Sequence, residues 1–448
     1  MTQKKIKKSN NFYYFELLFF FLIFLTIFFF FYGFIVGENS AGSGGYKGDF
    51  DNVWKTLQTF LNNDIKESIK SSSATSYLPE QPYISSRTPL IYMLNELFNP
   101  FTNSKVNFIR SIFFFSLLTP ILFYYSLKIK YPKINKSILI LLACTILLSP
   151  YFRTSSYWAL EENYGIIFIF ISFILLETFF KEKNKILNKY IKLFFLTFAS
   201  SLCVYFDQKL LIIPLLCFIK IIFSDENKIL KISTFLMYII FSLPFLYLIF
   251  LWGNILPTTV VDIRNTGKFF HLSHVGFTLT IIGFYFIPLF FFKDSNILHN
   301  VKFYLKNKNN SLLLLIFLIY LFFSYIFDDY QNSSYPNLGK GVIHKLSLLL
   351  FDNLFIQKLF IYFNFAIFYF IVVLFLNRKF SENLVILYFI ISSIFIFPIL
   401  QEYYDPLIFI LVFIFFDLRL KINYKNVLFL FFYLAFFLIY AKLHYSKI

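Results

Sequence analysis

The chain has 448 residues, and 41 Lys and Arg residues against 24 Asp and Glu residues give it a formal net charge of +17. Hydrophobic residues make up 58% of the sequence and aromatic residues 23%, whereas charged residues make up only 15%. Soluble domains carry about 25% charged residues, and disordered chains have low hydrophobicity, so both classes are excluded. The composition predicts an all-α, polytopic membrane protein that forms a single integral-membrane domain over residues 1–448.

The first apolar segment runs from Phe15 to Val36 and follows a group of lysines at the N-terminus. It is longer than the roughly 7–15 apolar residues of a secretory signal, so we expect an uncleaved first span. A membrane helix needs about 20 apolar residues. Further apolar segments complete a predicted bundle of 12–13 spans, and they lie near residues 108–127, 137–152, 163–180, 191–206, 210–223, 232–252, 273–292, 311–327, 355–376, 384–400, 406–418 and 426–441.

Lysine and arginine predict the orientation of these spans, because both are retained on the cytoplasmic side of a membrane. Basic clusters at Lys128–Lys130, Lys181–Lys183 and Arg419–Lys421 fall in alternating loops, as a cytoplasmic N-terminus requires. These retention charges also account for the positive net charge. We therefore expect the lipid bilayer, and not a nucleic acid, as the partner of this chain.

One long extracytoplasmic loop, residues 37–107, is expected to follow the first span. Within it, apolar residues recur at helical spacing from Phe50 to Leu61, which predicts an amphipathic helix at the membrane interface with Trp54 in the headgroup layer. The flexible stretch Gly42–Gly45 precedes this helix, and a second helical stretch is expected from Thr88 to Phe98. The polar complexity of the sequence is concentrated on this side of the membrane, so the chemistry is expected there.

The cysteines give no sign of a cofactor or a disulfide. Cys144, Cys203 and Cys217 all lie inside apolar segments, without the spacing of a metal site. A cysteine in such a place is usually a small apolar side chain. No cofactor is expected.

Asp49 and Asp51 stand at the start of the predicted interfacial helix. Carboxylates at a helix N-terminus are stabilised by the helix dipole, which would by itself explain both residues. Either could instead act as a general base that deprotonates a sugar hydroxyl. A third role, binding of a divalent metal through carboxylate oxygens, is also open.

Arginines and glutamates of the predicted outer loops are candidate substrate-binding residues. Arg87 precedes the second helical stretch and could hold a phosphate with its bidentate fork, or it could reach lipid headgroups. Arg153, Glu161 and Glu162 lie in a loop that also carries hydroxyls and aromatic rings, a composition that suits a sugar. Two adjacent glutamates beside an apolar span are unusual, because burial of a carboxylate is costly.

Further candidates lie at the expected outer ends of later spans. Ionisable groups between two tightly joined apolar segments are expensive and are functional hypotheses by default, although an Asp–Lys pair can also mark a simple turn. His271 and His274 could share a helix face, but no third metal ligand accompanies them, so phosphate or sugar binding is favoured over a metal site. Simple solvation of both histidines at the outer surface is the other interpretation. These candidates are Asp207, Gln208, Lys209, Arg264, His271, His274 and Glu402.

Together these positions resemble those of the C-type integral-membrane glycosyltransferases, which use polyprenyl-phosphate-linked sugars. That family has an acidic residue soon after the first span, in a long outer loop with an interfacial helix, and Gly48-Asp49-Phe50-Asp51 takes that place here. The resemblance implies that Asp49 or Asp51 is the catalytic base. It also implies a polyprenyl-phosphate sugar as donor and a lipid-linked glycan, a lipid or a protein as acceptor.

Within that family the chain is similar to the dolichyl-phosphate-glucose-dependent α-1,2-glucosyltransferases. Four short stretches carry the similarity, and they are Arg87–Tyr92, Val204–Gln208, Leu251–Asn254 leading to His271 and His274, and Gln401–Pro406. The expected location is the bacterial cytoplasmic membrane, with the active site facing outward.

Two other classes stay open. A transporter or lipid-linked sugar flippase would carry ionisable residues in the middle of its spans or broken repeats, whereas most charges here lie at span ends. An O-antigen polymerase or ligase would, by resemblance, have its large outer loop late in the chain, whereas here the first loop is the large one.

Overall fold

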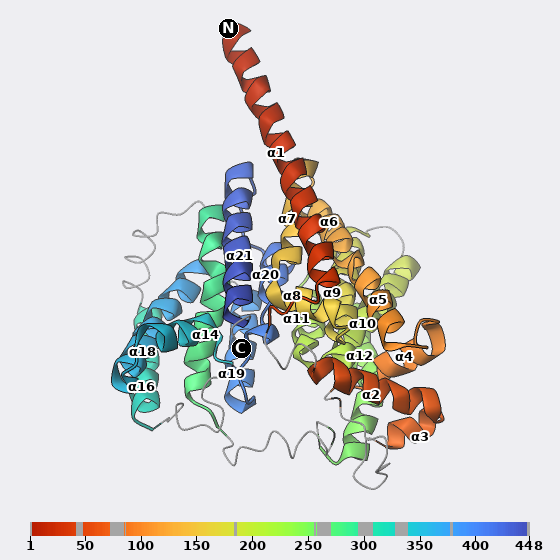
Figure 1. Ribbon diagram of the computed structural model, residues 1–448. Helices are drawn as coiled ribbons and strands as arrows, with labels where there is room; N and C mark the ends of the chain where they lie inside the picture. The colour runs from red at the N-terminus through yellow and green to blue at the C-terminus, as the bar shows by residue number, and fades with distance from the viewer. Residues whose placement is uncertain are drawn as a thin grey trace. The chain divides into compact units, whose positions relative to one another are not determined.

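The computed structural model describes residues 2–41, 48–71, 85, 87–182, 186–254, 257, 270–293, 308–327, 339–376 and 380–445. Within these residues every regular element is helical, which confirms the predicted all-α class (Figure 1). The predicted flexible stretch Gly42–Gly45 lies outside the described residues.

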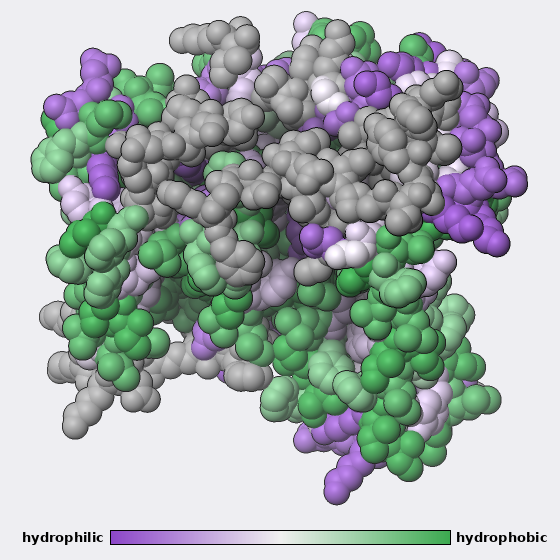
Figure 2. All heavy atoms as spheres, turned by 90° about the horizontal axis from the view of Figure 1, so that it is seen from below, coloured by the Kyte–Doolittle hydropathy of each residue, from purple (hydrophilic) through white to green (hydrophobic). Residues whose placement is uncertain are grey.

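Seven helical segments of the described chain are long and apolar enough to cross a membrane. They are α1 (Thr2–Ile35), α5 with α6 (Lys105–Ser116 and Leu118–Lys130), α9 (Glu162–Lys181), α10 (Ile186–Phe206), α12 (Lys228–Trp252), α18 (Leu354–Phe375) and α21 (Tyr424–Tyr445). Large apolar side chains such as Phe20, Phe24 and Phe250 are more than half exposed on these helices. Figure 2 shows apolar side chains over much of the face that it draws. These properties indicate an integral membrane protein.

An eighth candidate span is broken. Helix α7 (Lys136–Cys144) continues as a 3₁₀ turn, η2 (Thr145–Leu148), and the chain then bends by 69° into α8 (Pro150–Tyr157). The break has a local cause, because Pro150 has no N–H to continue the first helix and instead begins the next one. The hydroxyl of Ser149 caps α8 by accepting a hydrogen bond from the backbone N–H of Phe152 at 3.0 Å.

The predicted count of 12–13 spans stays a prediction. Two of the expected segments form helices shorter than a span, since residues 210–223 hold η3 (Gln208–Leu211) and the 11-residue α11 (Ile212–Ile222). Residues 406–418 hold only α20 (Leu407–Ile410) and the π-helical turn η6 (Leu411–Phe415).

The helices group into two compact units. The first unit comprises residues 1–264, 413–415 and 423–448, and the second comprises residues 265–412 and 416–422. The single integral-membrane domain expected from the sequence stays a prediction.

Side-chain contacts in the first unit define the directions of its central helices. Lys192, near the start of α10, contacts Glu182 at the end of α9, so these two helices run in opposite directions. Helices α10 and α12 run in the same direction, because their contacts rise together in sequence. The contacts are Thr197 with Met237, Ser200 with Tyr238, and Tyr205 with the carbonyl of Phe241.

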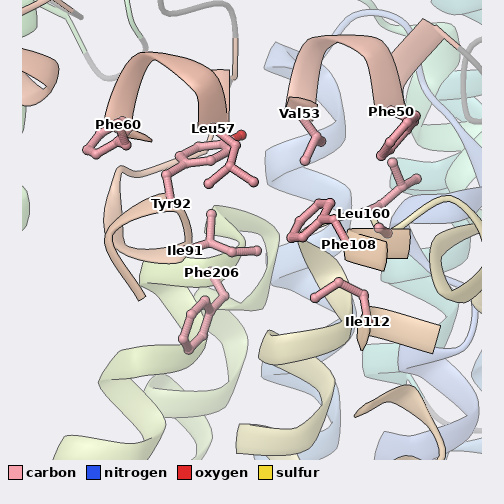
Figure 3. Close-up of a cluster of buried hydrophobic side chains, with 11 residues drawn as sticks. Phe50, Val53, Leu57, Phe60, Ile91, Tyr92, Phe108, Ile112, Leu160 and Phe206 are labelled. Atoms are coloured by element: carbon pink, nitrogen blue, oxygen red, sulfur yellow. The ribbon is translucent and has the colours of Figure 1, made fainter. Parts of the chain in front are cut away.

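Helix α2 (Asp49–Asn62) is amphipathic, as the sequence predicts, but its apolar face packs on protein. Phe50, Val53, Leu57 and Phe60 are almost completely buried. Burial of such a side chain contributes about 1.5–3 kcal/mol. In Figure 3 these residues face a layer made by α4 (Leu90–Phe98), α5, the chain before α9 and the end of α10. The layer contains Ile91, Tyr92, Phe108, Ile112, Leu160 and Phe206.

This packing corrects part of the expectation for α2. The ring centroids of Trp54 and Phe108 lie 5.8 Å apart, so the partly buried Trp54 side chain packs on the protein. The apolar face of α2 therefore covers α4 and α5 and is not the surface by which this helix would lie on lipid. The short α3 (Ile65–Lys70) follows it.

The second unit is built around α14 (Ser273–Phe286) and α18. Gly276 and Gly283 lie on one face of α14, against the rings of Phe365 and Phe368. A Cβ atom at either glycine would overlap these rings, so the small residues let the two helices approach closely. The other elements are η4 (Pro288–Phe292), α16 (Lys308–Phe327), α17 (Gly341–Leu350), α19 (Phe380–Phe395) and η5 (Gln401–Tyr403).

Contacts between α1 and α21 in the first unit predict that the two termini lie on opposite sides of the membrane. Phe15 of α1 contacts Tyr424 of α21, and Glu38, just after α1, lies 2.5 Å from Lys442 near the end of α21. The two helices therefore run in the same direction, and if both span, the termini emerge on opposite sides. Protease treatment of sealed vesicles should remove a tag at only one terminus. Removal of both tags, or protection of both, would contradict this parallel arrangement.

Candidate functional site

Five ionisable side chains from three separate segments meet in the first unit. Arg87 lies just before α4, Glu161 and Glu162 lie at the N-terminus of α9, and Asp207 and Lys209 lie in the turn after α10. We call these five residues the charged cluster. All five were predicted as substrate-binding residues, and the structure brings them together across more than a hundred residues of sequence.

Ion pairs connect the members of the charged cluster. Nη2 of Arg87 donates to Oε1 of Glu162 at 2.9 Å, and Nη1 of Arg87 lies 3.4 Å from Oδ1 of Asp207. Nζ of Lys209 lies 2.9 Å from Oδ2 of Asp207 and 3.7 Å from Oε1 of Glu162. The Asp207 side chain is fully buried, whereas Arg87, Glu162 and Lys209 each keep 17–18% of their side-chain surface exposed.

Glu161 is held by neutral hydrogen-bond donors. Its Oε1 accepts from the Tyr92 hydroxyl at 2.6 Å and from the Ser85 hydroxyl at 2.9 Å. The Ser85 oxygen in turn accepts from the backbone N–H of Arg87 at 3.0 Å, so Glu161 also orients the chain that carries the arginine. Burial raises the pKa of Glu161 above its ordinary value, although the charge of Arg87 opposes this. The raised pKa favours the protonated acid.

The local sequence explains why the three segments meet. Helix α10 ends at Phe206, where Asp207 adopts an extended backbone conformation and caps η3 by accepting from the Lys209 backbone N–H at 3.2 Å. The hydroxyl of Thr88 donates to the backbone carbonyl of Tyr205, which joins the chain before α4 to the end of α10. Pro89 then sets the start of α4.

The charge balance of the cluster limits what it can bind. With all groups ionised, three carboxylates oppose two cations, and protonation of Glu161 leaves two of each sign. Burial by itself lowers the pKa of Arg87, but the nearby Asp207, Glu162 and Glu161 raise it well above its ordinary value, so the guanidinium stays charged. Within the described residues Oε2 of Glu162 is buried without a hydrogen-bond partner, which leaves one carboxylate oxygen able to accept from a ligand.

Arg153, a predicted substrate-binding residue, has its donors occupied within the protein. Its Nε and Nη2 donate to the two carboxylate oxygens of Glu38, each at 2.7 Å. The other bonds of its guanidinium go to the backbone carbonyls of Leu147 and Phe29, at 3.1 and 2.8 Å. The side chain is completely buried and joins the end of α1 to the bend between α7 and α8. These contacts describe a structural role for Arg153.

Gly33 makes room for this buried pair. A Cβ atom on Gly33 would lie 2.5 Å from Nη2 of Arg153, 2.5 Å from Oε2 of Glu38 and 2.7 Å from the hydroxyl of Tyr157. Only glycine therefore fits at this turn of α1. Burial by itself raises the pKa of Glu38, but its hydrogen bonds and the charges of Arg153 and Lys442 bring it below its ordinary value.

Asp49 and Asp51, the predicted catalytic base, lie in the first turn of α2. Asp49 is exposed, and Asp51 is half exposed and pairs with Lys105 at 3.2 Å. Both carboxylates face solvent on α2, whose apolar face covers Tyr92 and Leu160, the neighbours of the charged cluster in sequence and structure.

The remaining predicted residues lie in other parts of the chain or outside the described residues. Gln208 is half-buried in η3. In the second unit, His271 and His274 are buried and stack with their centroids 4.7 Å apart, and Nδ1 of His274 lies 2.8 Å from the Ile396 carbonyl. Glu402 lies in η5 of the same unit. Arg264 lies outside the described residues.

Sequence reasoning missed four residues: two that contact the charged cluster and two that surround Arg153. Tyr92 ends the stretch Arg87–Tyr92 that carries the family resemblance, which was its signal, whereas Ser85 gave none. Glu38 could have been noticed as an acid directly after the first apolar segment. Lys442 gave no signal, because nothing in the sequence places the last span beside the first.

Metal binding has no support in the described part of the chain. No group of three or more His, Cys, Asp or Glu side chains there could hold a metal ion.

Comparison of the chain with protein-family models, with curated proteins and with solved structures found no match.

The buried and exposed ion pairs predict unequal effects on stability. Glu38→Gln leaves Arg153 buried without its charge partner and should lower the free energy of unfolding by about 3–5 kcal/mol. Asp51→Asn removes an exposed pair and should cost less than about 1 kcal/mol. Thermal unfolding of the purified variants, compared with the unmodified protein, measures both. Equal effects of the two substitutions would contradict the structural role of Arg153.

The lowered pKa of Glu38 also predicts a pH dependence. A carboxyl group whose pKa is lower in the folded state stabilises the protein above its unfolded pKa, about 4.3, and loses that contribution as the pH falls towards the folded value. The difference in unfolding temperature between the unmodified protein and Glu38→Gln should therefore be largest at neutral pH. It should shrink below about pH 4.3, and a difference that grows on acidification would exclude this assignment.

Proposed function

We propose that this chain is a membrane glycosyltransferase that moves a sugar from a polyprenyl phosphate to an acceptor hydroxyl. The observation that carries the proposal is the charged cluster at the ends of apolar helices. Ionisable groups at such places are costly and are usually kept for function. Two cations, three carboxylates and a tyrosine hydroxyl offer partners for both a phosphate and a sugar.

In the proposed reaction, the acceptor oxygen forms a bond to the anomeric carbon of the donor sugar. The bond between that carbon and the phosphate oxygen breaks, and its electron pair leaves with the polyprenyl phosphate. The acceptor proton passes to a carboxylate, for which Asp49 and Asp51 are the candidates. Positive charge beside the leaving phosphate stabilises it, an effect that is usually large in such sites.

Arg87 and Lys209 are the proposed phosphate-binding pair. Arg87 stays charged in this site, and its planar fork suits two phosphate oxygens. Binding would exchange the contacts of Arg87 and Lys209 with Glu162 and Asp207 for contacts with the phosphate. Tyr92 and Ser85 hold Glu161 through hydrogen bonds, and the buried Oε2 of Glu162, which has no hydrogen-bond partner within the described residues, is an acceptor for a sugar hydroxyl.

The acceptor and the location follow from the same proposal. A lipid-linked glycan, a lipid or a protein would offer its hydroxyl from the aqueous side, and the donor would arrive through the bilayer. A bacterial cytoplasmic membrane with an outward-facing site fits the alternation of basic loops in the sequence.

One observation also favours a second class, a proton-coupled transporter or lipid-linked sugar flippase. A buried acid with a raised pKa beside two other carboxylates can take up and release a proton, as carboxylates of transporters do. Movement of an intact lipid-linked sugar across liposomes, without turnover, would decide for this class.

The test is sugar transfer by the purified protein from a panel of synthetic polyprenyl-phosphate sugars to added acceptors. Loss of the base should reduce the rate about 10²–10⁴-fold in Asp49→Asn or in Asp51→Asn. Asp64→Asn, an exposed aspartate at the start of α3, is the matched control and should keep full activity. Full activity in both test variants would remove the proposed base.

Two further variants make the outcome specific. Lys105→Gln breaks the Asp51–Lys105 pair but keeps the carboxylate, so it should stay active if Asp51 is the base. Arg87→Lys keeps the charge but loses the fork, and we expect at least a tenfold loss, on the order of the one hydrogen bond to a charged group that it removes. An unchanged rate in Arg87→Lys would exclude bidentate phosphate binding there.

A further inference from the structure

Large apolar side chains are exposed at the end of α4 and in the turn that follows it, outside every candidate span. Leu97 is 57% exposed, Phe98 75% and Phe101 54%. No charged residue lies from Leu97 to Ser104. We call residues 97–101, the end of α4 and the residues after it, the apolar turn. Scattered single exposed side chains need no explanation, but three large ones within five residues outside a span do.

The apolar turn has a defined conformation, because Asn99 organises it. Its Nδ2 donates to Oδ1 of Asn95 in α4 and to the Ser111 hydroxyl in α5, both at 2.9 Å. Its Oδ1 accepts from the backbone N–H of Phe101 at 3.0 Å. The Asn95 oxygen also accepts from the Tyr164 hydroxyl at 3.1 Å, which joins the turn to α9. These hydrogen bonds fix the turn in one conformation, in which Phe98 and Phe101 are exposed.

The apolar turn continues into the exposed face of a candidate span. Helices α5 and α6 expose apolar side chains on one face, interrupted by the exposed Arg110, and these are Val106, Phe114, Leu118, Ile121 and Tyr125. The apolar turn precedes the first of them by five residues, and Figure 1 draws α4 beside the start of α5. A span exposes such a face to lipid, so the neighbouring turn meets the same medium.

We propose that the apolar turn is inserted into the edge of the bilayer and that lipid acyl chains cover Leu97, Phe98 and Phe101. Aromatic and aliphatic side chains are the groups that bury in this layer, and the flanking Glu96 and Lys105 lie just outside the uncharged stretch 97–104. Insertion would fix the depth of α4. Because a helix rises 1.5 Å per residue, the nine residues of α4 place Arg87 roughly 15 Å from the inserted Phe98.

This arrangement brings the charged cluster within reach of a lipid headgroup layer, whatever reaction the cluster serves. The inference does not depend on glycosyl transfer, because it concerns only the turn and the bilayer. A catalytic test could therefore fail while the membrane contact stands, and the reverse is equally possible.

Nitroxide spin labels at introduced cysteines test the contact in the full chain, in nanodiscs of phosphatidylcholine and phosphatidylglycerol. The three native cysteines are buried, so labels would report the introduced sites. Phe98→Cys and Phe101→Cys should be relaxed strongly by oxygen and weakly by a water-soluble nickel complex. Phe114→Cys, on the span, is the control for lipid, and Asn62→Cys, exposed on α2, is the control for water.

The expected result is an oxygen-to-nickel accessibility ratio at Phe98 and Phe101 that is at least several-fold above that at Asn62 and close to that at Phe114. A ratio like that of Asn62 at both positions would overturn the proposal. Spin–spin broadening or a disulfide-linked dimer at Phe98→Cys would also overturn it, by showing that a second copy covers the turn. The use of two separate positions keeps the test decisive if one variant does not fold.

Discussion

A charge inside an apolar helix bundle must find its partner within the protein, because lipid offers none, and this constraint organises the first unit. Arg153 meets it fully, with a bidentate pair to Glu38 and two backbone carbonyls. The pair joins the end of α1 to the bend between α7 and α8, and Lys442 adds α21. Gly33 leaves the space that this arrangement needs. A completely buried guanidinium held by four hydrogen bonds within the protein supports the fold and is poorly placed to bind a substrate.

The charged cluster meets the same constraint only in part. Its arginine and lysine are paired with Glu162 and Asp207, but it contains one more carboxylate than it has cations, and within the described residues Oε2 of Glu162 has no hydrogen-bond partner. Burial raises the pKa of Glu161, which is the direction that lessens this excess of negative charge. Incomplete pairing of this kind leaves exchangeable contacts, which is the physical reason to look for the function here and not at Arg153. The apolar layer under α2 covers the neighbours of the cluster, and the apolar turn extends from the same short helix α4.

Sequence reasoning found the members of the charged cluster because ionisable residues beside apolar segments are rare and easily recognised. It could not separate Arg87 from Arg153, since both are arginines of predicted loops near hydroxyls and acids. The difference lies in Glu38 and Tyr92, whose partners are more than a hundred and about seventy residues away. The helix from residue 50 to 61 was correctly predicted from its periodicity, but periodicity identifies an apolar face without saying whether protein or lipid covers it. Only the tertiary structure shows that α4 and α5 cover the apolar face of this helix.

The sequence by itself determined the helical class and the apolar character that indicates a membrane protein, because hydropathy and helical periodicity are local properties that lipid and backbone hydrogen bonding enforce. Only the tertiary structure decided which helices run side by side, where the chain of an expected span bends, and which charges meet. Those properties depend on contacts between residues far apart in sequence, and pairing energies of buried charges exist only once the chain has brought them together.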